Sequence, residues 1–484
     1  MQLPARVTFF RRRITFALVV GAASALIATP RAAWAHGHLV SSTPAAGAHL
    51  VAPPGSLRLT FSEAPELAFT SLSLTRVDGR DVSLARLRIA PNDKLTVVAT
   101  ITSPLAAGAY AVHWQMAGAD GHVVRGHYEF VVATGALPVN SSTSVGATAM
   151  THDNPITMPP GENGFGAGSW PYAVIRWLQF IALLAIIGAV AFRQLVLRYM
   201  RNEQRTSAAL MSDTERLPMI PIASHNAAQI AMWSVFLLAA TALLRLYAQS
   251  FALHGSMAVF DAALVAPMLT QTVWGYGWLL ELGALLLAFA GARRAERGAS
   301  WGLLTVGAIL LAFTPAFSGH ASSTPRLVEI AVIADGLHVL SAGGWLGSLL
   351  MVVAAGIPAA MRLDGKERGL AVADMVNAYS PTALTFAGLL VATGVLAAWL
   401  HVGSVPALWQ TTYGKTLLVK LAVLSVVAAT GAYNWLRVKP TLGQMEGTHR
   451  VRRSAMIELA VGLLVLAVTA VLVATPTAID VAAR

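Results

Sequence analysis

Three residues in the amino-terminal third of the chain could bind a divalent metal ion. His36 follows an Ala-Trp-Ala triplet that matches the small-x-small cleavage rule, so cleavage there would make His36 the new amino terminus. A terminal histidine chelates a metal through its α-amine and imidazole, and Cu(II), which tops the divalent affinity order, suits such nitrogens. Asp120 and His122 could complete a tetragonal site, although Asp-Gly is also a common turn that His122 could simply cap. His38 is close enough in sequence to serve as an alternative ligand.

Polar residues inside otherwise apolar stretches form a second group of candidates. Asp335 and His338 are spaced i, i+3, so one helix face presents both, and Trp345 lies on the same stripe. Ionisable groups within a bilayer are costly and indicate function by default. We expect a metal path that starts at His320 and descends to this pair, with His401 as a further candidate. The structural alternative is that His338 hydrogen-bonds a neighbouring helix and Asp335 accepts from it.

Three other charged residues fall within apolar stretches. Glu281 and Lys420 could pair with each other or relay protons, and a purely structural ion pair fits them equally well. Arg245 is expected to extend its guanidinium to the membrane surface, so it is assigned no role.

The elements that hold these residues begin with a secretory signal peptide over residues 1–35. A cluster of three arginines at 11–13 is followed by an apolar region at 14–28, which predicts cleavage after residue 35; an uncleaved anchor is the alternative. The next domain is then exported. Because the chain has no cysteine, a metal must be held by nitrogen, oxygen or thioether ligands.

Residues 36–132 are expected to form a small Ig-like β-sandwich. Short alternating runs separated by turn residues recur about seven times, which is typical of a sandwich. The clearest runs are 57–61, 71–76, 95–101, 109–114 and 127–132. His113 alternates with apolar neighbours, so it should point to solvent. Acidic and basic residues balance in this segment, which gives no bias toward nucleic acid.

Residues 133–169 are rich in Gly, Ser, Thr and Pro and are interpreted as a flexible linker. His152 and Met158 lie in it and could hand a metal along, but solvated linker residues describe them better. The remainder, 170–484, is expected to be an all-α transmembrane domain. The whole chain of 484 residues is 56% hydrophobic and 12% charged, whereas soluble domains carry about 25% charged residues.

Eight apolar stretches are long enough to span a bilayer, which needs ~20 residues. They centre on 171–192, 226–248, 273–291, 301–318, 328–356, 379–401, 414–436 and 455–475. The loops at 193–216, 292–300, 361–369 and 437–453 are rich in Lys and Arg, whereas the intervening loops hold only Arg326. The positive-inside rule therefore predicts that both ends of the domain face the exported side.

The first domain resembles the periplasmic copper-binding family CopC. The motifs that carry the resemblance are HGHLVSSTPAAGAHL at 36–50, LRLTFSEA at 57–64 and YAVHWQMAGADGHVVRGHYEFVV at 110–132. The resemblance implies a Cu(II) site of His36, Asp120 and His122, with Glu63 as a supporting residue. CopC members that also bind Cu(I) carry a methionine-rich loop, and residues 75–95 hold no Met, so a Cu(II)-only form is expected.

The membrane domain resembles the inner-membrane copper protein CopD. Its motifs are GHASSTPRLVEIAVIADGLHVLSAGGWLGSLL at 319–350, TGVLAAWLHVGSVPALWQTTYGKTLLVKL at 393–421 and RRSAMIELAVGLLVLAVTAVLVATP at 452–476. One chain with both modules is similar to the CopC–CopD fusions. This implies a copper-resistance and transport protein of the bacterial inner membrane that imports copper, with periplasmic donors and a cytoplasmic acceptor as partners.

Other functions are considered alongside copper transport. No G-x-S-x-G, P-loop or H-E-x-x-H pattern occurs, so the chain is not expected to be an enzyme. A membrane haem protein, in which facing histidines bind iron, is the competitor from another class. A copper sensor or scaffold that binds the metal without moving it is the third possibility.

Overall fold

The computed structural model describes residues 38–119, 121, 123–133, 169–210, 219–295, 300–323, 327–438, 445–475 and 477. The expected signal peptide, residues 134–168 of the expected linker, and the predicted ligands His36, Asp120 and His122 lie outside the described residues. The chain divides into two compact units. One comprises His36–Ser169 and Ala248–Thr272, and the other Met1–Ala35, Trp170–Tyr247 and Val273–Arg484.

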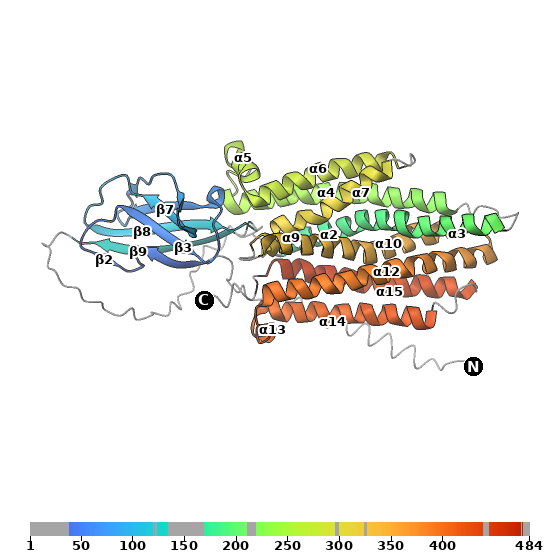
Figure 1. Ribbon diagram of the computed structural model, residues 1–484. Helices are drawn as coiled ribbons and strands as arrows, with labels where there is room; N and C mark the ends of the chain where they lie inside the picture. Colours follow the sequence, from blue (N-terminus) through green and yellow to red (C-terminus); the bar gives the residue numbers. More distant parts are fainter. Residues whose placement is uncertain are drawn as a thin grey trace. The chain divides into compact units, whose positions relative to one another are not determined.

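The described part of the first unit contains a two-sheet β-sandwich, as the alternating runs predict (Figure 1). One sheet has the strand order β1-β3-β7-β6 and the other β2-β9-β8-β4-β5. The elements are β1 (Leu39–Thr43), β2 (His49–Leu50), β3 (Ser56–Phe61), η1 (Leu67–Phe69), β4 (Ser71–Arg76), β5 (Asp81–Val82), β6 (Arg88–Ala90), β7 (Asp93–Thr100), β8 (Gly108–Ala117), β9 (Val123–Val132) and α5 (Ala262–Thr270). The described residues include more strands than predicted because β2 and β5 are two residues long and display no alternation.

Alternation along β8 and β9 separates a buried face from an exposed one. The two strands pair antiparallel from Gly108 opposite Val132 to Ala117 opposite Val123. Their inward side chains form much of the sandwich core: Tyr110, Val112, Trp114, Met116, Tyr128, Phe130 and Val132. Burial raises the pKa of Tyr128 to about 12, so its phenol stays neutral in the core. His113 is exposed on the opposite face, as predicted.

Gly126 is required by the packing of Trp114, its partner in register. A Cβ atom at position 126 would lie 2.4 Å from Trp114 Cζ2. Gly126→Ala is therefore expected to destabilise the sandwich by about 1–3 kcal/mol, the usual cost of overpacking. Amide hydrogen exchange of β8 and β9 in the full chain measures this loss. Gly55→Ala is the control, because its Cβ would meet nothing within 4 Å; equal exchange in both variants would contradict the prediction.

The second unit is helical, and the described residues contain 8 helices long and apolar enough to cross a membrane, as predicted. These spans are Trp170–Glu203, Met219–His254, Val273–Arg293, Ser300–Ser318, Val328–Ala360, Glu367–Val402, Thr412–Tyr433 and Arg450–Val473. The elements that build them are α2 (Trp170–Ala191), η2 (Phe192–Val196), α3 (Leu197–Leu210), α4 (Met219–His254), α6 (Val273–Arg293), α7 (Ser300–Phe313), η3 (Thr314–Ser318), α9 (Val328–Ala342), η4 (Gly343–Gly347), α10 (Ser348–Met351), η5 (Val352–Gly356), α11 (Ile357–Ala360), α12 (Gly365–Val402), α14 (Thr412–Tyr433), η6 (Asn434–Val438) and α15 (Met445–Val473). Two short helices, α8 (His320–Ser323) and α13 (Ala407–Gln410), precede α9 and α14.

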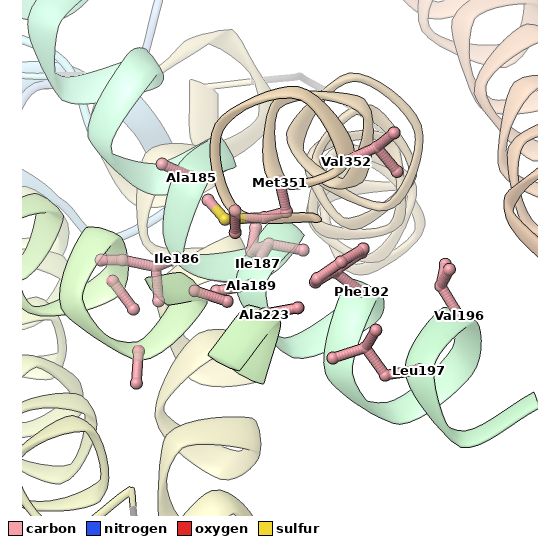
Figure 2. Packing of buried hydrophobic residues seen from close by; sticks show 14 of the residues in the cluster. Ala185, Ile186, Ile187, Ala189, Phe192, Val196, Leu197, Ala223, Met351 and Val352 are labelled. Atoms are coloured by element: carbon pink, nitrogen blue, oxygen red, sulfur yellow. The ribbon is translucent and has the colours of Figure 1, made fainter. Parts of the chain in front are cut away.

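Small residues allow the central helices to approach closely. A Cβ atom at Gly188 of α2 would lie 2.1 Å from the carbonyl carbon of Gly347 in η4, so both backbones meet there. Such contacts are typical of membrane helix pairs, which associate by packing rather than by the hydrophobic effect. Ile186, Phe192 and Met351 belong to the large buried cluster around this contact (Figure 2). The fifth span is thereby fixed against α2, and α9 within it packs along α12.

Candidate functional site

The described beginning of the chain is tied to the end of β3. The amide nitrogen of His38 donates to Ser62 Oγ at 3.0 Å, and the Ser62 amide donates to the His38 carbonyl at 3.0 Å. His38 lies two residues after His36 in the sequence, so these bonds fix the described residue nearest in sequence to the predicted terminal ligand.

Glu63 connects this segment to the turn that carries the other predicted ligands. A Cβ atom at Gly118 would lie 2.6 Å from Glu63 Oε2, so the carboxylate rests directly over that glycine. The Gly121 amide donates to the Gly118 carbonyl at 3.0 Å, and Gly121 has a φ of +78°, which glycine adopts without strain. Glu63 therefore lies against the Gly118–Gly121 turn, and His38 is bonded to the residue before Glu63, whereas Asp120 and His122 themselves lie outside the described residues.

Gln249 also contacts this turn, and sequence reasoning missed it. Its Nε2 atom donates to the Gly121 carbonyl at 2.7 Å within the same compact unit, and its side chain is buried. A glutamine far away in sequence, at the end of an apolar stretch, carries no local signal for such a contact.

The predicted membrane pair has a hydrogen bond to a threonine of α12 and lies within electrostatic range of a lysine of α14. His338 Nδ1 lies 2.9 Å from Thr393 Oγ1 of α12. Asp335, one turn earlier on α9, interacts electrostatically with Lys420 of α14 and with His401 of α12. His338 interacts electrostatically with Lys420 as well. Three helices therefore contribute to one polar group of residues inside the spans, which we call the α9–α12–α14 cluster: Asp335, His338, Thr393, His401 and Lys420.

The hydrogen bonds of Thr393 favour a proton on Nδ1 of His338. The threonine hydroxyl has one hydrogen, and it donates to the Leu389 carbonyl at 2.8 Å. The hydroxyl oxygen therefore accepts from His338 Nδ1–H, and Nε2 has the lone pair in neutral His338. A metal-binding histidine commonly donates its second N–H in this way, which fixes ring and tautomer. The ring packs next to Gly394, where a Cβ would lie 3.4 Å from His338 Cε1, an ordinary van der Waals contact.

The other candidates of the membrane path lie in different surroundings. His401 Nδ1–H donates to the Ala397 carbonyl at 2.7 Å, one turn back on α12. Trp345 is buried in an apolar cluster with Leu184 and Val461. His320 begins α8, and its side chain lies outside the described residues. In the described part of the chain, no three His, Asp or Glu side chains are grouped so as to hold a metal by themselves.

The proposed pairing of Glu281 with Lys420 is wrong. Glu281 Oε2 accepts from Arg245 Nη1 at 2.9 Å, and the two side chains are 1% and 3% exposed. Gln179 Nε2 donates to the other carboxylate oxygen at 3.3 Å, and Arg245 Nη2 donates to Ser318 Oγ at 2.8 Å. The expectation that Arg245 reaches the membrane surface is wrong for the same reason: the buried carboxylate of Glu281 on α6 holds this α4 residue inside the unit.

A second buried carboxylate was also missed. Glu458 of α15 accepts from Asn434 Nδ2 at 3.0 Å, and Asn434 Oδ1 accepts from Ser454 Oγ. The pattern of apolar residues in this span predicts a membrane helix but says nothing about which neighbour its one acidic residue meets.

Family models match three parts of the chain. The CopC domain matches residues 39–133, the copper resistance protein D-like N-terminal domain matches residues 167–326, and copper resistance protein D matches residues 373–472. Together they cover the sandwich and most of the helical unit.

Individual relatives match the same regions. The copper transport protein CutJ of Bacillus subtilis is 25% identical over 465 residues, which is 93% of this chain and 76% of CutJ. Copper resistance protein C of Pseudomonas syringae is 37% identical over 105 residues, covering 21% of this chain and 82% of that protein. Copper resistance protein D of the same organism is 26% identical over 312 residues, which is 61% of this chain and 93% of that protein.

Proposed function

The chain belongs to the copper-resistance proteins that join a CopC domain to a CopD domain, and from this premise we propose that it captures Cu(II) outside the membrane and moves copper inward. Capture is assigned to the sandwich and transport to the helical unit. Inward direction follows the family resemblance. The exported side holds both ends of the membrane domain, in agreement with the distribution of Lys and Arg in its loops.

His36, Asp120 and His122 are proposed as the Cu(II) ligands, with His38 and Glu63 as supporting residues. The support for this assignment is the bonding of His38 to Ser62 and the position of the Glu63 carboxylate over Gly118. His38 is thus bonded beside Glu63, and Glu63 lies against Gly118, two residues before Asp120 in the sequence. Nitrogen and carboxylate ligands fit Cu(II), and the chain has no cysteine that would favour a softer ion.

Adding one residue before His36 should weaken Cu(II) binding strongly, because it removes the free α-amine from the imidazole-bearing residue. The loss should at least equal the ~10–100-fold that follows removal of a group supporting a metal ligand. Competition with a chromophoric chelator measures the affinity. His49→Gln, an exposed histidine on β2, is the control and should have the affinity of the native chain. An unchanged affinity in the extended chain would rule out chelation by the amine.

Copper is proposed to pass along His320, Asp335 and His338, with Lys420 beside the carboxylate. The observation that carries this proposal is the hydrogen bond between His338 and Thr393, which leaves Nε2 as the nitrogen able to bind copper. Asp335 on the same helix face offers a carboxylate oxygen, and Lys420 provides a positive charge that balances it when the path is empty. Copper here is cargo, so two or three weak ligands suit release better than a closed site.

Thr393→Val should lower copper flux into proteoliposomes by roughly 10–100-fold, because valine has the same shape but cannot accept the Nδ1–H bond that orients the imidazole. Flux is measured with isotopically enriched copper and reconstituted full-length protein. Thr385→Val is the matched control: this threonine lies on the same helix, is exposed and bonds only its own backbone at Pro381. If the native chain gave no flux, transport would be excluded and a copper-binding sensor or scaffold would be the remaining function. Equal flux in the Thr393→Val and Thr385→Val variants would show that Thr393 takes no part in transport.

A further inference from the structure

Two histidines lie next to each other on the outer face of the five-stranded sheet. His113 of β8 and His127 of β9 are directly opposed in antiparallel register. Their rings stack with centroids 5.7 Å apart and an interplanar angle of 27°. Both side chains are exposed, and neither belongs to the terminal site or to the α9–α12–α14 cluster.

The strands that carry this pair form a rigid frame. β8 and β9 are neighbouring interior strands of their sheet, with β2 and β4 on either side. The residues that flank each histidine in sequence point the other way, and Val112 and Tyr128 are buried in the core. Directly opposed residues of an antiparallel pair have Cβ atoms about 4.5–5.5 Å apart, so the two imidazoles start from fixed and adjacent positions.

We propose that His113 and His127 form a second metal site that binds a divalent transition metal, Cu(II) most tightly. Metal–imidazole bonds are about 2.0–2.1 Å long, so the two ligating nitrogens must come within about 4 Å of each other. Rings with centroids 5.7 Å apart reach that separation by small rotations of exposed side chains. In the described part of the chain no third His, Asp or Glu is grouped with them, so water completes the coordination. Imidazole ligands and open positions favour Cu(II) over the other divalent ions.

The surrounding charges are compatible with a bound cation. Glu129 lies two residues along β9 on the same face, opposite Ala111. On the other side, Arg125 donates from Nε to Gln115 Oε1 at 2.8 Å, which holds its guanidinium toward β8 in the adjacent row. The pair therefore has a carboxylate on one side and a bonded guanidinium on the other.

Copper counting on the purified full chain tests the proposal. Equilibrium dialysis against buffered Cu(II), followed by mass-spectrometric metal analysis, should give one bound ion fewer in His113→Gln, in His127→Gln and in the double variant than in the native chain. Each single change should lower the affinity for this ion by at least about tenfold, because the second imidazole acts at an effective concentration in the millimolar range. Single and double variants should lose the same ion, as expected for one ion held by two ligands.

His49→Gln is the matched control, because it removes another exposed histidine of the same sheet and should leave the count unchanged. A second readout uses Zn(II): it should slow amide exchange of β8 and β9 in the native chain but in neither single variant. The same copper count in the native chain and in both single variants would overturn the proposal. Loss of the terminal site by chain extension would remove a different ion, so the two assignments fail independently.

Discussion

Replacing His338 with alanine is expected to reduce copper flux in proteoliposomes to the level of protein-free vesicles. Its imidazole is the nitrogen ligand on the face of α9 that also carries Asp335, and Thr393 of α12 orients it. Without it, a copper ion would have to leave water for a region in which the Asp335 carboxylate is near the positive charge of Lys420 and the other imidazole, His401, is on a different helix, and a charge there is costly. Flux of isotopically enriched copper, measured at equal protein incorporation, checks this result.

Two controls make the His338 experiment specific. His225→Ala removes an exposed histidine on α4 and should leave flux unchanged. The absorption spectrum of the purified native chain separates the haem alternative, because haem bound by helix histidines would give a Soret band and a copper conduit would not. Native flux in the His338→Ala variant would exclude the proposed path, and a Soret band that disappears in this variant would favour the haem protein.

Replacing Glu281 with alanine is expected to lower the free energy of unfolding of the helical unit by about 3–5 kcal/mol, the usual cost of leaving a buried charge without its partner. Arg245 would lose its 2.9 Å bond to the carboxylate while it stays buried and bound to Ser318. Gln179 would lose its acceptor as well. Unfolding in mixed micelles, followed by circular dichroism, measures the change.

The double variant Glu281→Leu with Arg245→Met tests whether the loss comes from the unpaired charge. Replacing both partners of a buried ion pair with apolar residues is often neutral or stabilising, so this variant should recover most of the loss. Glu329→Ala, an exposed glutamate in the first turn of α9, is the control and should change stability little. If the double variant were as unstable as Glu281→Ala, packing rather than charge would explain the effect.

Local pattern was sufficient for the longer elements of the fold, but not for the two-residue strands β2 and β5. The alternation at 57–61 and 71–76 predicted strands that the structure has at Ser56–Phe61 and Ser71–Arg76. The exposure of His113 follows from the same two-residue period. The eight spans follow from stretch length, because a bilayer requires about 20 apolar residues wherever a helix crosses it.

Partners distant in the chain could not be predicted in this way. The i, i+3 spacing of Asp335 and His338 identifies one helix face, but Thr393 and Lys420 reach it from two other helices. Nothing near Glu281 in sequence distinguishes Arg245 from Lys420 as its partner. The packing of the helices brings Arg245, and not Lys420, into contact with the carboxylate. The pairing of His113 with His127 depends on the register of two strands, which no spacing in the sequence fixes.

The sequence by itself therefore determined the two-part architecture, the number of spans and the residue types suited to copper, because these depend on periodicity, length and ligand chemistry along one chain. The tertiary structure alone decided which charges are paired inside the helical unit, which nitrogen of His338 contacts Thr393, and which histidines lie side by side. Those features depend on contacts between elements, where each buried polar group binds whichever partner the packing brings within hydrogen-bond distance.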